Sequence, residues 1–174
     1  MVGKLGTIVL FSANPEGIKL ELDPNFIHYR EITITGSESR TEKAAARAYE
    51  EAGVKKPREE ISMMEVHDCF SITELVTYED LHISPRGGAI KDIMDGFYDL
   101  DGGGVPCQVD GGLKCFGHPI GASGIRMIYE MYLQLHGRAD QRQLENPKFG
   151  LTHNLGGLPF QNVCSIAIVG KYDG

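Results

Sequence analysis

Three short segments of the chain combine residues capable of acid–base or nucleophilic chemistry with the means to position them. The first is His67-Asp68-Cys69-Phe70, between an expected strand and an expected helix. A thiol at the start of a helix feels the positive end of the helix dipole, which favours thiolate, and a neighbouring histidine can exchange protons with it. A structural cysteine beside a backbone-bonded histidine is the alternative, and this segment alone supports the two interpretations equally.

The second segment is rich in glycine and covers residues 111–124, with the sequence GGLKCFGHPIGASG. Its glycines let the backbone approach a ligand, and Pro119 restricts the chain directly after His118. A histidine held in this way is a candidate general base near neutral pH. The alternative is a glycine-rich turn or a phosphate-binding loop, but the spacing does not match a P-loop and Lys114 is misplaced for one.

The third segment, residues 153–157, reads HNLGG and lies between two expected strands. His153 is a candidate for a second titrating group, and Asn154 for a hydrogen-bond donor. Taken alone, the segment favours a polar hairpin turn.

The elements that must position these segments follow from periodicity and from helix start and stop signals. Residues 1–40 are predicted to form an irregular N-terminal segment with short strands at 7–12, 18–22 and 31–35. A domain over 41–174 follows, in which Ser71 and Glu74 suggest a capping box. We expect helices near 39–52, 71–81 and 122–136, strands at 61–66, 149–153 and 163–169, and a loop over 84–117 with a helical fragment at 90–94. This order indicates an α/β domain with a mixed sheet.

Composition narrows the class of protein. The 174 residues carry a net charge of -7 and include four cysteines. The acidic balance without a basic patch argues against a nucleic-acid partner. The cysteines form no CxxC pair, which argues against a disulfide framework and a structural metal site, and favours a reducing, cytoplasmic location. No apolar run reaches the ~20 residues of a membrane span, so no membrane association is expected.

Together, HDCF, GHPIGASG and HNLGG, in this order, resemble the C-terminal half of thiolases. The resemblance covers roughly residues 41–170 and is closest to the branch of sterol-carrier-protein-2 thiolases and archaeal-type acetyl-CoA acetyltransferases. It implies a thiolase-like layered α/β fold, with a mixed sheet of about five strands and helices packed on it. The implied chemistry is Claisen condensation, or thiolysis of a 3-oxoacyl-CoA.

The resemblance also implies roles for individual residues. His118 becomes the general base that activates a nucleophilic cysteine, and His67 an oxyanion-hole donor. Cys69 becomes the acid/base cysteine, with His153 in a supporting or second oxyanion role. The residues expected to bind substrate are Asn154, Gly117, Pro119, Phe70 and Gly156. Coenzyme A enters as part of the substrate, and no cofactor or metal is implied.

None of the four cysteines lies in a segment that resembles the thiolase nucleophile. We therefore expect an acyltransferase subunit that acts on acyl-CoA or acetyl-CoA with a partner supplying that cysteine, either a thiolase N-terminal half or a full-length homologue. A second copy of the chain and a zinc-ribbon/OB-fold protein are further candidate partners. Two other functions stay open: a thiolase-like aldolase acting on a CoA thioester, and a non-catalytic acyl-CoA-binding subunit.

Overall fold

A mixed three-stranded sheet forms the centre of the molecule. The computed structural model describes residues 7–10, 33–36, 40–158 and 161–170. Strands β3 (Met63–Glu65), β4 (Phe149–Leu158) and β5 (Gln161–Gly170) lie in the order β3-β4-β5. β3 pairs with β4 in parallel and β4 with β5 antiparallel, so the predicted mixed sheet is confirmed.

The number of strands in that sheet was predicted wrongly. About five were expected in one sheet, but within the described residues the central sheet has three. Strands β1 (Thr7–Leu10) and β2 (Thr33–Gly36) pair in parallel in a second, two-stranded sheet. The expected strand at 18–22 lies outside the described residues. Local alternation can mark a strand, but it cannot say which sheet the strand joins, because that choice depends on distant partners.

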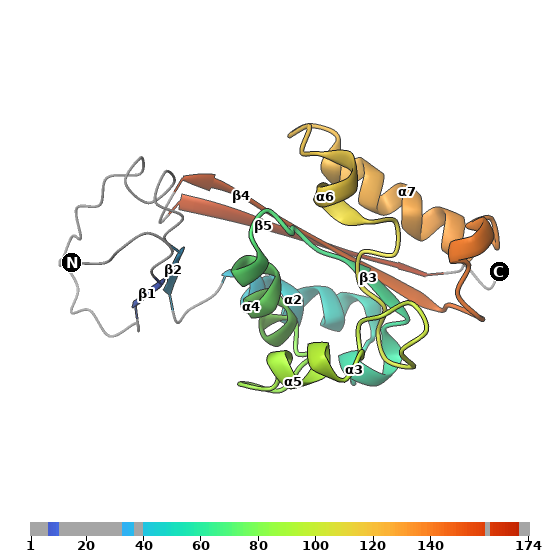
Figure 1. Cartoon of the computed structure of the whole chain (residues 1–174), viewed down its shortest axis with the longest axis horizontal. Helices are drawn as coiled ribbons and strands as arrows, with labels where there is room; N and C mark the ends of the chain where they lie inside the picture. Colours follow the sequence, from blue (N-terminus) through green and yellow to red (C-terminus); the bar gives the residue numbers. More distant parts are fainter. Residues whose placement is uncertain (1–6, 11–32, 37–39, 159–160, 171–174) are drawn as a thin grey trace.

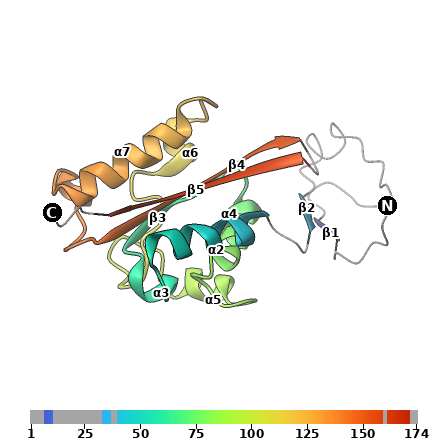
Figure 2. The same cartoon turned by 180° about the vertical axis from the view of Figure 1, so that it is seen from behind.

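Helices cover the central sheet on both faces (Figures 1 and 2). Helices α6 (Gly112–Phe116) and α7 (Ser123–Leu135) lie on one face. On the other lie helices α2 (Arg40–Ala52), α3 (Pro57–Glu60), α4 (Ser71–Asp80) and α5 (Ala89–Met94). A short 3-10 turn at Asp140–Arg142 follows α7. The predicted α/β class, with helices packed on a mixed sheet, is confirmed.

The core has two parts because both faces of β3 are buried. Successive side chains on a strand point to opposite faces. Met64 packs into the larger cluster with Leu81 and Leu151, whereas Met63 packs with Met131 and Leu135 of α7. Gly150 on β4 allows α7 to come close, since a Cβ there would lie 2.1 Å from the Met131 sulfur. Together these contacts fix α7, and the loop that precedes it, against the strand that leads to His67.

Three local expectations were wrong. The segment HNLGG is no turn, because residues 153–157 continue β4 to Leu158 and His153 pairs with Ile166. The capping box fails because Phe70 is the N-cap of α4 and makes no side-chain cap, while the Glu74 carboxylate accepts a hydrogen bond from the Tyr78 hydroxyl. Within the expected loop over 84–117, α5 was foreseen and α6 was not, since α6 begins at a glycine, which is a poor helix former, and glycines cap both of its ends.

Candidate active site

The first and third chemical segments meet at His153. Its ring is fully buried on β4. Nδ1 of His153 accepts the backbone N–H of His67 at 3.4 Å, and Nε2 lies 3.1 Å from Oγ1 of Thr41 at the start of α2. Because Nδ1 accepts a hydrogen bond, the neutral ring carries its proton on Nε2, which donates a hydrogen bond to Oγ1 of Thr41. Both ring nitrogens of His153 are therefore engaged inside the chain.

Burial keeps His153 uncharged. Desolvation, with a smaller contribution from His67, lowers the pKa of His153 from 6.5 to about 4. A neutral ring suits its two hydrogen bonds, because a protonated ring would have to donate at the nitrogen that faces the His67 N–H. The geometry makes His153 a support for the backbone of the first segment.

His67 and His118 bring the first and second segments together. Their rings lie with centroids 4.9 Å apart in an edge-to-face arrangement, with an interplanar angle of 70°. His67 is buried, and its Nδ1 has no hydrogen-bond partner among the described residues. Desolvation and the nearby His118 lower the pKa of His67 below its usual value. His67 is thus neutral at pH 7, and its buried Nδ1 is left unpaired by the described residues.

His118 is exposed and held by the start of α7. Its Nδ1 lies 2.8 Å from Oγ of Ser123, and that hydroxyl donates to the Pro119 carbonyl at 3.3 Å. With the single hydroxyl proton used in this way, Nδ1 of His118 is the donor to Ser123. Nε2 is then the basic nitrogen, which is the arrangement required of a general base.

Asp68 joins the first segment to the glycine-rich one by a second route. Its Oδ1 accepts the backbone N–H of Leu113 at 3.0 Å. Gly112 lies so close that a Cβ there would come within 2.6 Å of Asp68 Oδ2, and its φ of +63° also disfavours a side chain. Glycine at this position is therefore required for the two segments to pack together.

Cys69 stands at the exposed end of its segment, directly before α4. Desolvation raises the pKa of its thiol, and the Sγ–Oγ1 distance to Thr73 is 4.0 Å. The expected shift toward thiolate from the helix dipole does not prevail, so the thiol is the resting form. A neutral thiol can give a proton to a carbanion and take one back, which fits an acid/base group better than a resting nucleophile.

The residues expected to bind substrate lie around these groups. Asn154 follows His153 and packs against the glycine-rich segment, since a Cβ on Gly124 would lie 3.1 Å from its Nδ2. Phe70 and Pro119 are exposed beside Cys69 and His118. Gly117 and Gly156 are exposed as well, and Gly117 ends α6 with a φ of +70°. Their role in binding stays a prediction.

A buried charged cluster below the site was not foreseen from the sequence. Arg126 of α7 donates from Nη1 to Glu65 Oε2 at 3.2 Å and to Asp110 Oδ2. Burial and the neighbouring Asp110 raise the pKa of Glu65 to about 9. Glu65 precedes His67 by two residues, and a single charged residue in an otherwise apolar strand was the only available signal.

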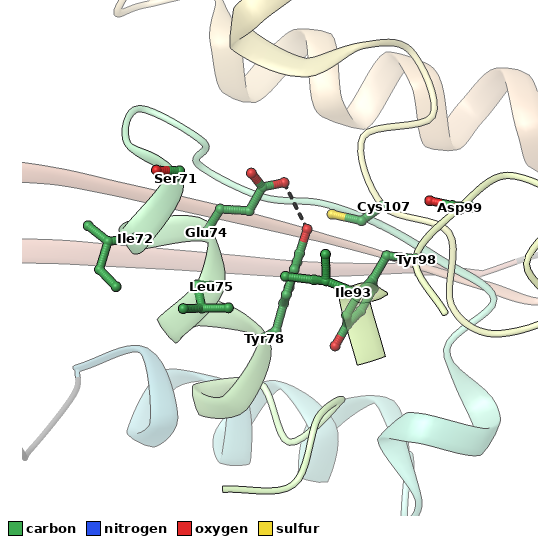
Figure 3. A pocket seen from close by; sticks show the side chains of 9 residues that line it. All are labelled: Ser71, Ile72, Glu74, Leu75, Tyr78, Ile93, Tyr98, Asp99 and Cys107. Carbon is green, nitrogen blue, oxygen red and sulfur yellow. Dashed lines mark hydrogen bonds between the residues drawn. The ribbon is translucent and has the colours of Figure 1, made fainter. Parts of the chain in front are cut away.

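A pocket of about 490 Å³ opens beside the first segment, between α4 and α5 (Figure 3). The stacked rings of Tyr78 and Tyr98, 3.9 Å apart, form part of its lining together with the Cys107 thiol. Ser71 and Glu74 add polar atoms near the start of α4. None of the four residues predicted to be catalytic lines this pocket.

An apolar surface extends from His118 along α6 and α7. Ile125, Ile128, Tyr129 and Tyr132 recur at helical spacing and share one exposed side of α7. Phe116 and Ile120, the latter 87% exposed, flank His118 in the sequence. We call these six residues the α7 surface. Exposed apolar side chains grouped on one side of a helix indicate a candidate interaction site.

The part of the chain that the structure describes contains no helix both long and apolar enough to cross a bilayer. Within the same residues, His, Cys, Asp and Glu side chains form no group of three or more that could hold a metal ion.

Comparison with known sequences and structures gives a consistent result. The family described as "Thiolase C-terminal domain-like" matches residues 26–169. The acetyl-CoA acetyltransferase of Methanothermobacter thermautotrophicus is 44% identical over 56% of this chain, which is 25% of that protein. Rabbit sterol carrier protein 2 is 42% identical over 67% of this chain and 21% of its own length.

Two further matches are a thiolase subunit and a solved structure. The benzoylsuccinyl-CoA thiolase subunit BbsB of Thauera aromatica is 37% identical over 75% of this chain and 33% of that subunit. The structure described as "Ltp2-ChsH2(DUF35) aldolase" superposes on this chain with a TM-score of 0.58 and is 21% identical to it. The match covers 75% of this chain and 31% of the other, and it shows that the two share a fold. In each case the chain spans no more than about a third of the matched protein.

Proposed function

Because the chain belongs to the thiolase C-terminal domain-like family, we propose that it supplies the acid–base half of an acyl-CoA acyltransferase site. Its substrate would be a CoA thioester, cleaved by thiolysis or joined by Claisen condensation. The observation that carries the proposal is the convergence of His67 and His118, from separate segments, with ring centroids 4.9 Å apart.

The chemistry assigned to each group follows from its environment. His118, exposed and with Nδ1 bound to Ser123, offers Nε2 as the base that activates a cysteine thiol. His67, neutral and facing His118, would donate a hydrogen bond to a thioester or enolate oxygen and so stabilise its negative charge. Cys69, kept as a thiol by desolvation, exchanges the proton at the carbon α to the thioester. His153 holds the His67 backbone in place.

The nucleophilic cysteine would come from a partner seated on the α7 surface. This surface begins at His118, so a protein that covers it brings its own residues next to the exposed imidazole. A thiolase N-terminal half, or a homologue that contains one, is the proposed occupant. BbsB is itself named as a thiolase subunit, which supports a division of the site between chains.

The test is an assay of the native assembly, isolated from the source organism through a tag on this chain. We expect it to consume coenzyme A and acetoacetyl-CoA and to form acetyl-CoA, whereas the isolated chain does not. An assembly that turns over no 3-oxoacyl-CoA of any chain length would contradict the proposal.

A second candidate reaction, carbon–carbon cleavage by an aldolase, is favoured by one observation: the similar fold of the structure described as an aldolase. Such a reaction needs an acid and a base, but no nucleophilic cysteine. The same assembly would then release an aldehyde or ketone from a 3-hydroxyacyl-CoA without consuming coenzyme A, so product analysis distinguishes the two reactions.

A further inference from the structure

The two histidines that face each other stand on elements joined by one arginine. His67 lies two residues after the end of β3, and His118 is held by Ser123 in the first turn of α7. Arg126 lies three residues after Ser123 on the same helix. Its guanidinium reaches across to Glu65, the last residue of β3, at 3.2 Å.

Asp110 adds α6 to the link between β3 and α7. Its Oδ2 accepts from Arg126, while its Oδ1 accepts the backbone N–H of Gly112, the first residue of α6. The Arg126 guanidinium also lies 5.3 Å from the centre of the Phe116 ring, at the other end of α6. Both hydrogen bonds come from Nη1, while the planar guanidinium also faces the Phe116 ring. The compact ammonium of lysine, on a shorter side chain, does not reproduce this combination of reach and planar packing.

We propose that Arg126 is a positioning residue: by binding Glu65 and Asp110 together, it fixes β3, α6 and α7 so that His118 faces His67. The inference rests on the proposed function of this histidine pair, and assigns to it a residue that touches neither ring. Burial strengthens the role, because the side chain of Glu65 is fully buried, that of Asp110 is 5% exposed and that of Arg126 15%. A displaced arginine would leave buried Asp110 without its cation and Glu65 without its hydrogen-bond donor.

A matched control is the ion pair between Glu130, further along α7, and Arg142 of the 3-10 turn that follows it. Arg142 binds Glu130 of α7 with an Nη2–Oε2 distance of 3.0 Å, and the side chain of Glu130 is 3% exposed. This pair also holds α7 through a buried glutamate, but it lies more than a helical turn beyond Arg126 and away from His118. The variants Arg126→Lys and Arg142→Lys therefore remove the same chemical group from two ion pairs and retain the charge.

The experiment is NMR of the histidine rings in the full chain, which needs no turnover and so is independent of the proposed activity. The wild-type chain should show a nuclear Overhauser cross-peak between the His67 and His118 rings, and a His67 pKa below that of a free histidine. In Arg126→Lys we expect the cross-peak to be lost and the His67 pKa to rise, because His118 has moved away. Arg142→Lys should leave both unchanged.

Combining Arg126→Lys with His118→Ala distinguishes a specific effect on the position of His118 from a general destabilisation of the fold. With His118 replaced in His118→Ala, Arg126→Lys should cause no further rise in the His67 pKa, since the neighbour that lowered it is already gone. Should Arg126→Lys not fold, Asp110→Asn removes the other arm of the link with little change in shape. It is also measured with and without His118→Ala, so that the direct effect of the lost charge is subtracted.

The inference is overturned if a folded Arg126→Lys chain keeps both the cross-peak and the wild-type His67 pKa. It is also overturned if Arg142→Lys produces the same changes, or if the rise in the His67 pKa persists undiminished in the His118→Ala background.

Discussion

The surroundings of His153 and His118 differ in almost every respect, although both residues lie in family motifs. His153 is buried on a central strand, with both ring nitrogens bound within the chain. His118 is exposed at the start of a helix, with one nitrogen held by Ser123 and an apolar surface beside it. The difference teaches that the motifs are placed differently: one histidine is built into the architecture, and the other is exposed where the proposed partner and substrate would meet it.

The largest expected effect is the loss of partner binding when the exposed surface beside His118 is altered. Ile125→Glu places a charge on the α7 surface, where Ile125 is 70% exposed, so the isolated chain should fold normally. If a partner covers this surface, burying the unpaired charge should abolish assembly. Co-purification of the partner with the tagged chain measures it. Ile90→Glu, on the opposite helical layer at 64% exposure, is the matched control. Loss of the partner in Ile90→Glu alone would place the docking surface on the other layer.

A second prediction compares the loss of folding stability when each of the two histidines is replaced by alanine. His153→Ala leaves a cavity and an unsatisfied His67 N–H, and should lower the free energy of unfolding by about 2–4 kcal/mol. His118→Ala removes an exposed ring and should change it by no more than about 0.5 kcal/mol. Urea denaturation of both chains measures the difference. Equal losses would mean that His118 is as structural as His153.

A third prediction concerns pH. Folding lowers the His153 pKa from 6.5 to about 4, so between these values the unfolded chain binds a proton that the folded chain excludes. Stability from this residue is therefore complete above pH 6.5 and is lost as the pH falls to 4, by about 3 kcal/mol in total. The comparison of wild type with His153→Asn isolates this slope, because the amide does not titrate. Parallel pH profiles for the two chains would contradict a buried, neutral His153.

The smallest change in the free energy of unfolding is expected for a substitution of Glu65 by glutamine. Its folded pKa of about 9 lies above the usual value of 4.5, so at pH 7 the carboxyl holds its proton. Its stabilising contribution is present below pH 4.5 and is lost as the pH rises toward 9, opposite in sign to that of His153. Glu65→Gln keeps the size and neutrality of the group, and should cost less than about 1 kcal/mol at pH 7. A loss as large as that of Glu65→Ala, read from the same urea curves, would show that the charge itself is required.

What the sequence could predict depended on how local each signal was. The helix at Ser123 and the strands around His153 follow from periodicity, and the glycines around His118 marked the loop correctly. The continuation of this strand beyond His153 to Leu158 was missed because Gly156 and Gly157 suggest a turn, while pairing with β5 along the whole of β4 overrides that preference. The link from Arg126 to Glu65 spans 61 positions, so neither residue reveals the other locally.

The measurement that tests the central claim most directly is thiolysis by the native assembly carrying either wild-type chain or His118→Ala. The account predicts that the wild-type assembly cleaves acetoacetyl-CoA with coenzyme A, and that His118→Ala, with its partner still bound, is slower by about 10²–10⁴-fold, the usual contribution of a general base. An intact His118→Ala assembly that works at the wild-type rate would contradict it.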